Sequence, residues 1–326
     1  MKPWLFIAFC LLTGLSFGSF LDEETILDRG ERLTVSQNEL FYVKEGVKPP
    51  VIVLLHGFGA SVYSWDKVYK PLAEVSTVIA YDRPGFGYSS RVFSLPEGAY
   101  NPYLLDNQDE ILFDLVDSVA GSHQSLILVG HSAGAAVAVE AYFQKPDRIA
   151  ALILESPALE GHGPPQTSFS FDWSRVSFST PLVKIILTRV LESAIGMAWH
   201  DPSTFTEKDR YYYKKPLEIE GWEVALQLFT LSQTPRFFVN RLNEIAVPVL
   251  YITGAEDRVI PPNLTESYAA ATPDAELKVI PLCGHVAHEE QTETFIRSVI
   301  DFLNDRQLIE LTRSHSFYCQ NAPFVR

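Results

Sequence analysis

Short runs of apolar and β-branched residues recur along this chain, with helical patterns between them. Most runs are apolar at every position, which is typical of parallel strands covered by helices on both faces. The alternation predicts an α/β fold with a doubly wound, mostly parallel sheet. The expected strands are 51–55, 77–81, 126–129, 151–154, 249–253 and 277–280, with an antiparallel hairpin over 33–43 at the sheet edge, and the expected helices include 109–117, 133–143 and 294–303.

The alternation stops between the fourth and fifth expected parallel strands. Residues 158–246 carry aromatic side chains and helical stretches such as 183–191, but no strand pattern. A segment of this length is too long for an ordinary loop. We therefore expect a helical cap at 158–246 inserted into a core domain formed by 19–157 and 247–304, followed by a C-terminal tail at 305–326.

The N-terminus reads as a targeting segment. Lys2 precedes an apolar run, small residues follow at Ser16 and Gly18, and acidic residues end the run from Asp22. This pattern predicts a secretory signal peptide at 1–18 with cleavage after Gly18. The alternative is an uncleaved membrane anchor through 4–21, which is close to the shortest span of a bilayer. Both place the rest of the chain outside the cytosol, so we expect a secreted or membrane-tethered protein.

Charge and cysteine content exclude several classes of protein. The formal charge is 26 − 40 = −14, which argues against a nucleic-acid partner. Three cysteines are too few for a disulfide scaffold and lack metal-ligand spacing. Once Cys10 is removed with the signal peptide, Cys283 and Cys319 remain, as two free thiols or as a disulfide. Asn263 begins the sole glycosylation sequon.

The strongest local signal is Gly130-His131-Ser132-Ala133-Gly134, between an expected strand and an expected helix. This is the Gly-x-Ser-x-Gly nucleophile elbow, a turn so sharp that only very small residues fit beside the serine. The turn lifts the Ser132 hydroxyl clear of the sheet at a helix N-terminus. Ser132 is therefore the predicted nucleophile.

A serine hydroxyl is a weak nucleophile until a base removes its proton. After an elbow of this kind, the base is a histidine nearer the C-terminus. His285 follows the strand at 277–280 directly, at the carboxyl end where open α/β sheets build their sites. His288 is the competitor, but it falls in the first turn of a helix, where we expect a solvated side chain. The predicted base is His285.

The acid that orients the base should lie between the serine and the histidine. Asp257 sits just beyond the strand at 249–253 and is the predicted acid, which would hold the imidazole tautomer. Glu256 is adjacent but should point the other way. Glu155, after the preceding strand, is a possible substitute because acids recur at the strand ends of such sheets.

The negative oxygen of a tetrahedral intermediate needs donors. His56-Gly57-Phe58-Gly59 follows the first parallel strand, so the backbone N–H groups of Phe58 and Ala133 are the predicted oxyanion hole. His56 lacks further ligands at metal-binding spacing and is interpreted as structural. We expect no metal and no organic cofactor.

Together these segments resemble the α/β-hydrolase superfamily over about residues 33–304. The resemblance rests on His56-Gly57-Phe58-Gly59, Gly130-His131-Ser132-Ala133-Gly134, Gly254-x-x-Asp257 and Gly284-His285, in this order. The segment Asp82-Arg83-Pro84-Gly85-Phe86-Gly87-Tyr88-Ser89 also resembles the branch with haloalkane dehalogenases, epoxide hydrolases and related esterases. The first two use an Asp nucleophile, so Ser132 argues against both, and the insert resembles the family's cap.

These features predict a serine hydrolase, carboxylesterase-like or lipase-like, that cleaves carboxylic esters through an acyl-enzyme. The expected substrate is a small molecule with an apolar acyl group, which the aromatic residues of the cap could line. The same triad also supports thioester, carbon–carbon or peptide hydrolysis and cofactor-free peroxidation. A rival of another class is a ligand-binding receptor on the same fold. The sequence does not indicate an oligomeric state.

Overall fold

The computed structural model describes residues 23–160, 177 and 180–310. The predicted signal or anchor segment, parts of the predicted cap at 161–176 and 178–179, and the tail residues 311–326 with Cys319 lie outside the described residues. Cys283 is buried and free. None of the helices in the described ranges has the length and apolarity needed to cross a membrane.

One eight-stranded sheet organises the described chain, in the order β1-β2-β4-β3-β5-β6-β7-β8. The hairpin β1–β2 is antiparallel and β2 also pairs antiparallel with β4, whereas the neighbours from β4 to β8 are parallel. This is the predicted doubly wound, mostly parallel α/β sheet. The strands are β1 Glu31–Val35, β2 Asn38–Glu45, β3 Val51–Leu55, β4 Thr77–Tyr81, β5 Leu126–His131, β6 Ile149–Glu155, β7 Val249–Gly254 and β8 Ala275–Ile280.

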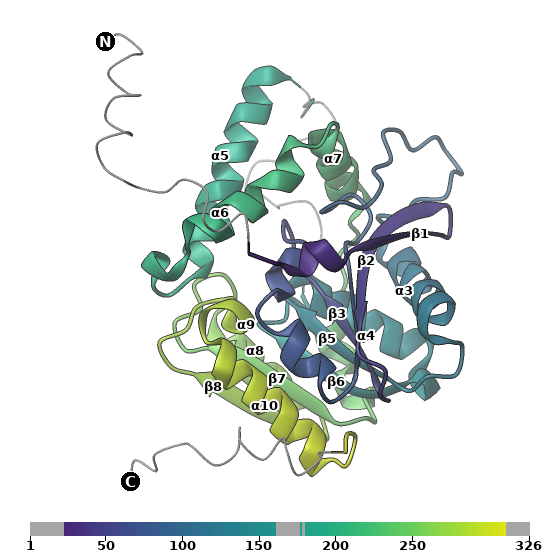
Figure 1. Ribbon diagram of the computed structural model, residues 1–326, viewed down its shortest axis with the longest axis vertical. Coiled ribbons are helices and arrows are strands. Elements are labelled where there is room, and N and C mark those ends of the chain that lie inside the picture. The colour runs from purple at the N-terminus through teal and green to yellow at the C-terminus, as the bar shows by residue number, and fades with distance from the viewer. Residues whose placement is uncertain (1–22, 161–176, 178–179, 311–326) are drawn as a thin grey trace.

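Helices cover both faces of the sheet (Figure 1). Along β3, Val53 packs into the core cluster that contains α3, α4 and α8, and Ile52 packs into the cluster that contains α2, α9 and α10. This explains why β3 is apolar at every position, since each face meets a helical layer. The helices are α2 Tyr69–Ala73, α3 Leu105–Ala120, α4 Ala133–Gln144, α5 Pro181–Ala198, α6 Glu207–Lys214, α7 Trp222–Ser232, α8 Pro262–Ala271, α9 Ala287–Glu290 and α10 Thr292–Asp305, with short 3₁₀ turns including η3 Val62–Trp65 and η8 Phe238–Glu244.

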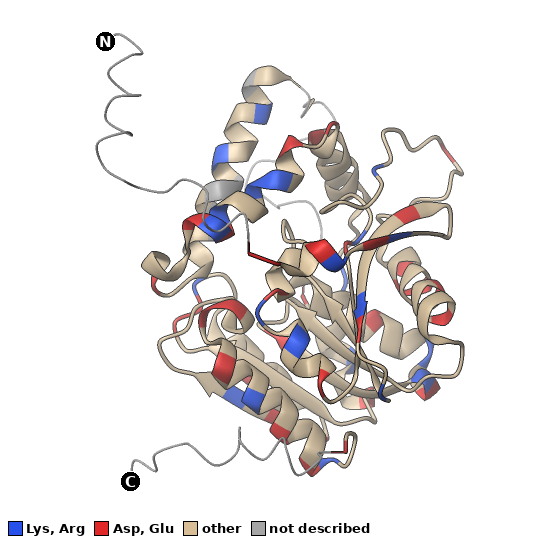
Figure 2. Ribbon diagram, in the orientation of Figure 1, with Lys and Arg blue, Asp and Glu red and all other residues tan. Residues whose placement is uncertain are grey.

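The chain between β6 and β7 carries α5, α6 and α7, which lie together at one end of the molecule (Figure 1). Near the C-terminal end of the described chain, α10 continues to Asp305, and Ile309 packs against the core of the sheet. The first residues of the predicted tail are therefore in contact with the core. Acidic and basic residues are interspersed along the outer helices, for example along α10 (Figure 2).

Candidate active site

Ser132 occupies a one-residue turn between β5 and α4. Its backbone has φ 52° and ψ −117°, a conformation that L-residues adopt only where the surrounding structure holds it. Two glycines make room for this turn. A Cβ on Gly134 would lie 2.1 Å from the Leu55 carbonyl oxygen, and one on Gly130 would lie 2.5 Å from Ala135 Cα. The elbow geometry thus requires the glycines that flank the serine.

His285 and Asp257 lie on different strand-end loops and meet in the structure. Nδ1 of His285 is 2.9 Å from Oδ2 of Asp257, and both side chains are buried. Oδ1 of Asp257 accepts from the backbone N–H groups of Val259 and Ile260 at 2.8 and 2.9 Å. Burial would raise the pKa of Asp257, but the His285 hydrogen bond and these backbone donors lower it below the ordinary value. An ionised Asp257 leaves Nε2 of His285 free to act as a base.

Ser132 is linked to this pair through the neighbouring His131. The ring centroids of His131 and His285 are 4.8 Å apart, and Nε2 of His131 lies 3.0 Å from the His285 carbonyl oxygen. Within the described residues, the side chains of Ser132 and His285 share no hydrogen bond. Such bonds often tighten only in a substrate complex. The structure therefore joins acid to base and brings the serine to the same strand ends, without a serine–histidine hydrogen bond.

The loop after β3 packs against the serine. A Cβ on Gly57 would lie 3.3 Å from Cβ of Ser132. The backbone N–H groups of Phe58 and Ala133, the two predicted oxyanion donors, have no backbone or side-chain acceptor among the described residues. Neither N–H group is therefore used by the protein in this part of the chain.

His56 supports this loop from behind. Its Nε2 accepts from the backbone N–H of Arg83 at 3.0 Å, so the ring proton is on Nδ1 and is donated to the Gly57 carbonyl at 2.8 Å. Burial and then the Arg83 charge hold the pKa of His56 well below its usual value. A neutral, fully hydrogen-bonded ring fits the structural role expected for His56.

A second imidazole–carboxylate pair is buried beside the first. Nδ1 of His288 lies 2.7 Å from Oε2 of Glu155, and both side chains are 0% exposed. The expectation of a solvated His288 is wrong, because α9 packs inward and sets the ring 4.3 Å from that of Trp65. Burial would lower the pKa of His288, but Glu155 raises it above the ordinary value. Glu155, the alternative acid, is thus engaged by His288 rather than His285.

Three of these groups could in principle hold a metal ion. Ligand atoms of His131, Glu155 and His288 lie within 4.8 Å of one another. Zinc needs each ligand at about 2.0–2.2 Å with the ligands apart from one another. Oε2 of Glu155 and Nδ1 of His288 instead form an ion-pair contact of 2.7 Å, without the geometry of a hydrogen bond. The donor set fits a closed ion pair better than a metal centre.

The loop that carries His285 is tied to the helices between β6 and β7. The His285 N–H donates to the Ala198 carbonyl at the end of α5, at 2.6 Å. Glu290 accepts from the N–H groups of Gly284 and His200, at 2.6 and 3.0 Å. Sequence reasoning missed Glu290, since no motif marks a carboxylate that bonds two distant backbone segments.

A further buried link joins α6 to α9. The Tyr213 hydroxyl donates to Oε1 of Glu289. Burial is the main reason that the pKa of Glu289 is raised to about 7, and His288 beside it acts in the opposite direction. The neutral form of Glu289 is therefore populated in the folded protein near neutral pH.

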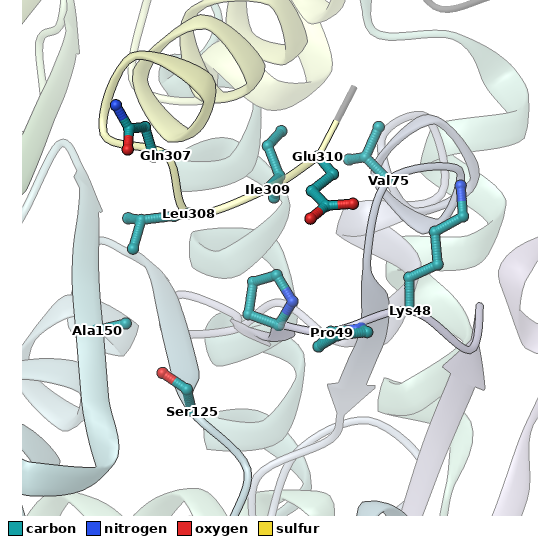
Figure 3. Close-up of a pocket in the computed structure, with 10 residues that line it drawn as sticks. Lys48, Pro49, Val75, Ser125, Ala150, Gln307, Leu308, Ile309 and Glu310 are labelled. Carbon is teal, nitrogen blue, oxygen red and sulfur yellow. The ribbon is translucent and has the colours of Figure 1, made fainter. Parts of the chain in front are cut away.

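Two cavities among the described residues lie at different ends of the strands. A narrow pocket of about 40 Å³ lies beside the oxyanion loop, between Gly59 and Ala60 on one side and Pro216, Trp222 and Leu226 on the other. A larger cavity of about 510 Å³ is lined by residues 48–50 before β3 and 307–310 after α10 (Figure 3). It opens at the amino ends of the strands, whereas sites of such sheets form at the carboxyl ends. Of the two, the small pocket borders the loop after β3 that carries Phe58, but Ser132, Asp257 and His285 are not part of its lining.

The sheet topology and the loops at its carboxyl edge are those of a hydrolase built on an α/β sheet. A family model for the alpha/beta hydrolase family matches residues 52–298, and the chain belongs to this family. Members that it resembles differ in their reactions.

One relative is a 2-hydroxy-6-oxononadienedioate/2-hydroxy-6-oxononatrienedioate hydrolase of Paraburkholderia phymatum. It is 26% identical over 85% of this chain and 93% of its own length. Among solved structures, an esterase from Thermogutta terrifontis covers 84% of this chain and 98% of its own, at 22% identity and a TM-score of 0.66. A bacterial membrane phospholipase A covers 85% and 86%, also at 22% identity and 0.66. The two structural likenesses establish the fold.

Proposed function

We propose that this α/β hydrolase cleaves carboxylic esters through an acyl-enzyme on Ser132. The contact between His285 and Asp257 is the observation that carries the proposal. His285 Nε2 would accept the Ser132 proton as Oγ attacks the ester carbonyl. The Phe58 and Ala133 N–H groups would hold the oxyanion. His285 would then protonate the leaving alcohol and activate water, which releases the acid and restores Ser132.

Apolar side chains around the small pocket support a substrate with an apolar group, although the volume of about 40 Å³ is itself too small for an acyl chain. Its lining includes Phe86, Leu217 and Leu226. The cation on its rim, Arg91, donates to the backbone carbonyls of Gly87, Ser89 and Pro216.

A panel of nitrophenyl esters of increasing acyl length tests the proposal, with Ser132→Ala as the control. We expect turnover and stoichiometric labelling by a fluorophosphonate in the wild-type protein, and neither in the variant. Full activity of Ser132→Ala would contradict the proposal. A tight ligand without turnover would favour the receptor function instead.

The resemblance to the dienedioate hydrolase supports a second candidate, hydrolysis of a carbon–carbon bond. The same variants serve for that test, with 2-hydroxy-6-oxononadienedioate as the substrate. Turnover of the dioate above that of every ester would favour this candidate.

A further inference from the structure

Arg83 is a buried cation with an unusual set of partners. Its side chain is 2% exposed and follows β4. Nη1 donates to Oε1 of Gln108 at 3.1 Å, and Nη2 makes a long hydrogen bond of 3.4 Å to the Gly57 carbonyl. The guanidinium also lies 5.2 Å from the centre of the Phe86 ring. No carboxylate pairs with it in the described part of the chain.

A buried and unpaired guanidinium lowers the stability of the folded protein, so a purely structural role does not explain it. A buried ion without a counter-ion carries a large desolvation penalty. Burial accordingly lowers the pKa of Arg83 to about 10, which still leaves it charged at neutral pH. An uncompensated positive charge held in a low-dielectric interior acts over several ångströms on whatever lies in front of it.

The group in front of Arg83 is the peptide that bears the predicted oxyanion donor. The Gly57 carbonyl and the Phe58 N–H belong to one planar peptide unit, and in the trans form they point in opposite directions. His56 and Arg83 both donate to that carbonyl, so they fix the direction of the Phe58 N–H and polarise it. His56 is neutral, and the charge therefore comes from Arg83 alone.

We propose that Arg83 is a positioning residue of the oxyanion hole, which acts through the Gly57–Phe58 peptide to stabilise negative charge beside Ser132. This inference rests on the proposed function. It adds that the oxyanion is stabilised by a fixed cation behind the loop, in addition to the two N–H donors. The effect falls on the tetrahedral state, because the ester carbonyl of the ground state carries little charge.

Two variants separate charge from packing. Arg83→Met removes the cation and keeps an apolar stem. Gln108→Glu leaves Arg83 in place and supplies the missing carboxylate to Nη1, which neutralises the charge. Arg148→Met is the control for loss of an arginine. Arg148 also bonds a backbone carbonyl and lies near the ring of Phe113, but it pairs with Asp117 and precedes the amino end of β6, at the opposite edge of the sheet from the site.

The assay compares turnover with the binding of two inhibitors. An alkylboronic acid forms a tetrahedral anionic adduct on a reactive serine, and an ether analogue of the ester reports ground-state binding. We expect kcat/KM to fall about 10- to 100-fold in Arg83→Met, below the about 100- to 1000-fold loss of an oxyanion donor. Gln108→Glu should show a smaller fall of the same kind. In both, boronic acid affinity should fall by the same factor as kcat/KM, with ether binding within twofold.

The inference is overturned if both variants keep kcat/KM and boronic acid affinity within twofold of wild type. Equal weakening of the boronic acid and the ether also overturns it, because that indicates a packing role. If Arg83→Met does not fold, Gln108→Glu decides by the same criteria. Failure of the proposed function is a separate result, in which the wild-type protein forms no Ser132-dependent boronic acid adduct and hydrolyses no ester.

Discussion

The Asp257→Asn variant is the sharpest test of the site, because it replaces one hydrogen-bond acceptor by a donor and leaves the shape of the side chain almost unchanged. Oδ1 of Asp257 accepts two backbone N–H bonds, from Val259 and Ile260, and an asparagine carbonyl can keep both. Its NH₂ group then replaces Oδ2, 2.9 Å from Nδ1 of His285. Two donors cannot face each other, so the imidazole must adopt the tautomer with its proton on Nε2. That tautomer cannot accept the Ser132 proton.

The expected loss of kcat is about 10⁴-fold at neutral pH, the size of the wrong-tautomer effect in serine hydrolases. Stability should fall by only about 1–3 kcal/mol, since one charge-assisted hydrogen bond is lost while the backbone bonds remain. Steady-state hydrolysis of a nitrophenyl ester and urea unfolding measure the two quantities on the same sample.

Two matched variants complete this test. Glu256→Gln changes the adjacent carboxylate, which accepts from the Cys283 N–H at 3.0 Å and can still do so as an amide. Glu155→Gln changes the carboxylate that pairs with His288. Both should keep kcat within a few-fold of wild type. The reasoning would be refuted if Asp257→Asn kept more than a tenth of kcat while Glu155→Gln lost it, because Glu155 would then be the acid.

Three further predictions concern stability and processing. Gly134→Ala should lower the free energy of unfolding by about 3 kcal/mol or prevent folding, because its Cβ would meet the Leu55 backbone. The control Gly196→Ala in α5 meets nothing within 4 Å and should be neutral or stabilising by about 1 kcal/mol. Equal melting temperatures of the two variants would contradict this prediction. For Glu289, with a pKa raised to about 7, the folded state binds a proton that the unfolded state releases above about pH 4.5, so wild-type stability falls as pH rises from 4.5 to 7. Glu289→Gln should therefore gain up to about 3 kcal/mol over wild type at pH 8 and little at pH 4.5 in urea unfolding, and a pH-independent difference would refute this sign. Cleavage of the predicted signal peptide would leave Ser19 as the first residue by N-terminal sequencing, whereas an intact N-terminus in the membrane fraction would indicate the anchor.

The strands were predictable because the sequence signal for them is local. β3 and β4 have the expected bounds, and the others extend the expected runs by a few residues. An apolar, β-branched run can be covered on both faces only in the interior of a layered sheet. The Gly-x-Ser-x-Gly turn was equally predictable from local sterics. A Cβ at Gly130 would collide with the backbone of α4, and a Cβ at Gly134 would collide with the backbone of the neighbouring strand β3.

Contacts between segments far apart in the sequence could not be predicted from local patterns. His288 was expected on the surface because a first-turn position gives no information about what packs on it, and only the docking of α9 decides its burial. The partners of Glu155 and Glu290 depend on the same docking, since each carboxylate bonds groups far away in sequence.

The amino-acid sequence by itself determined the layered sheet and the residue types that its strand ends present, because hydrophobic periodicity and glycine sterics act over a few neighbouring residues. Only the tertiary structure decided which imidazole faces which carboxylate, and that Arg83 stands uncompensated behind the Gly57 carbonyl. Those outcomes depend on how separate strand-end loops pack against one another, where hydrogen-bond geometry and the exclusion of water select among several side chains of the same chemistry.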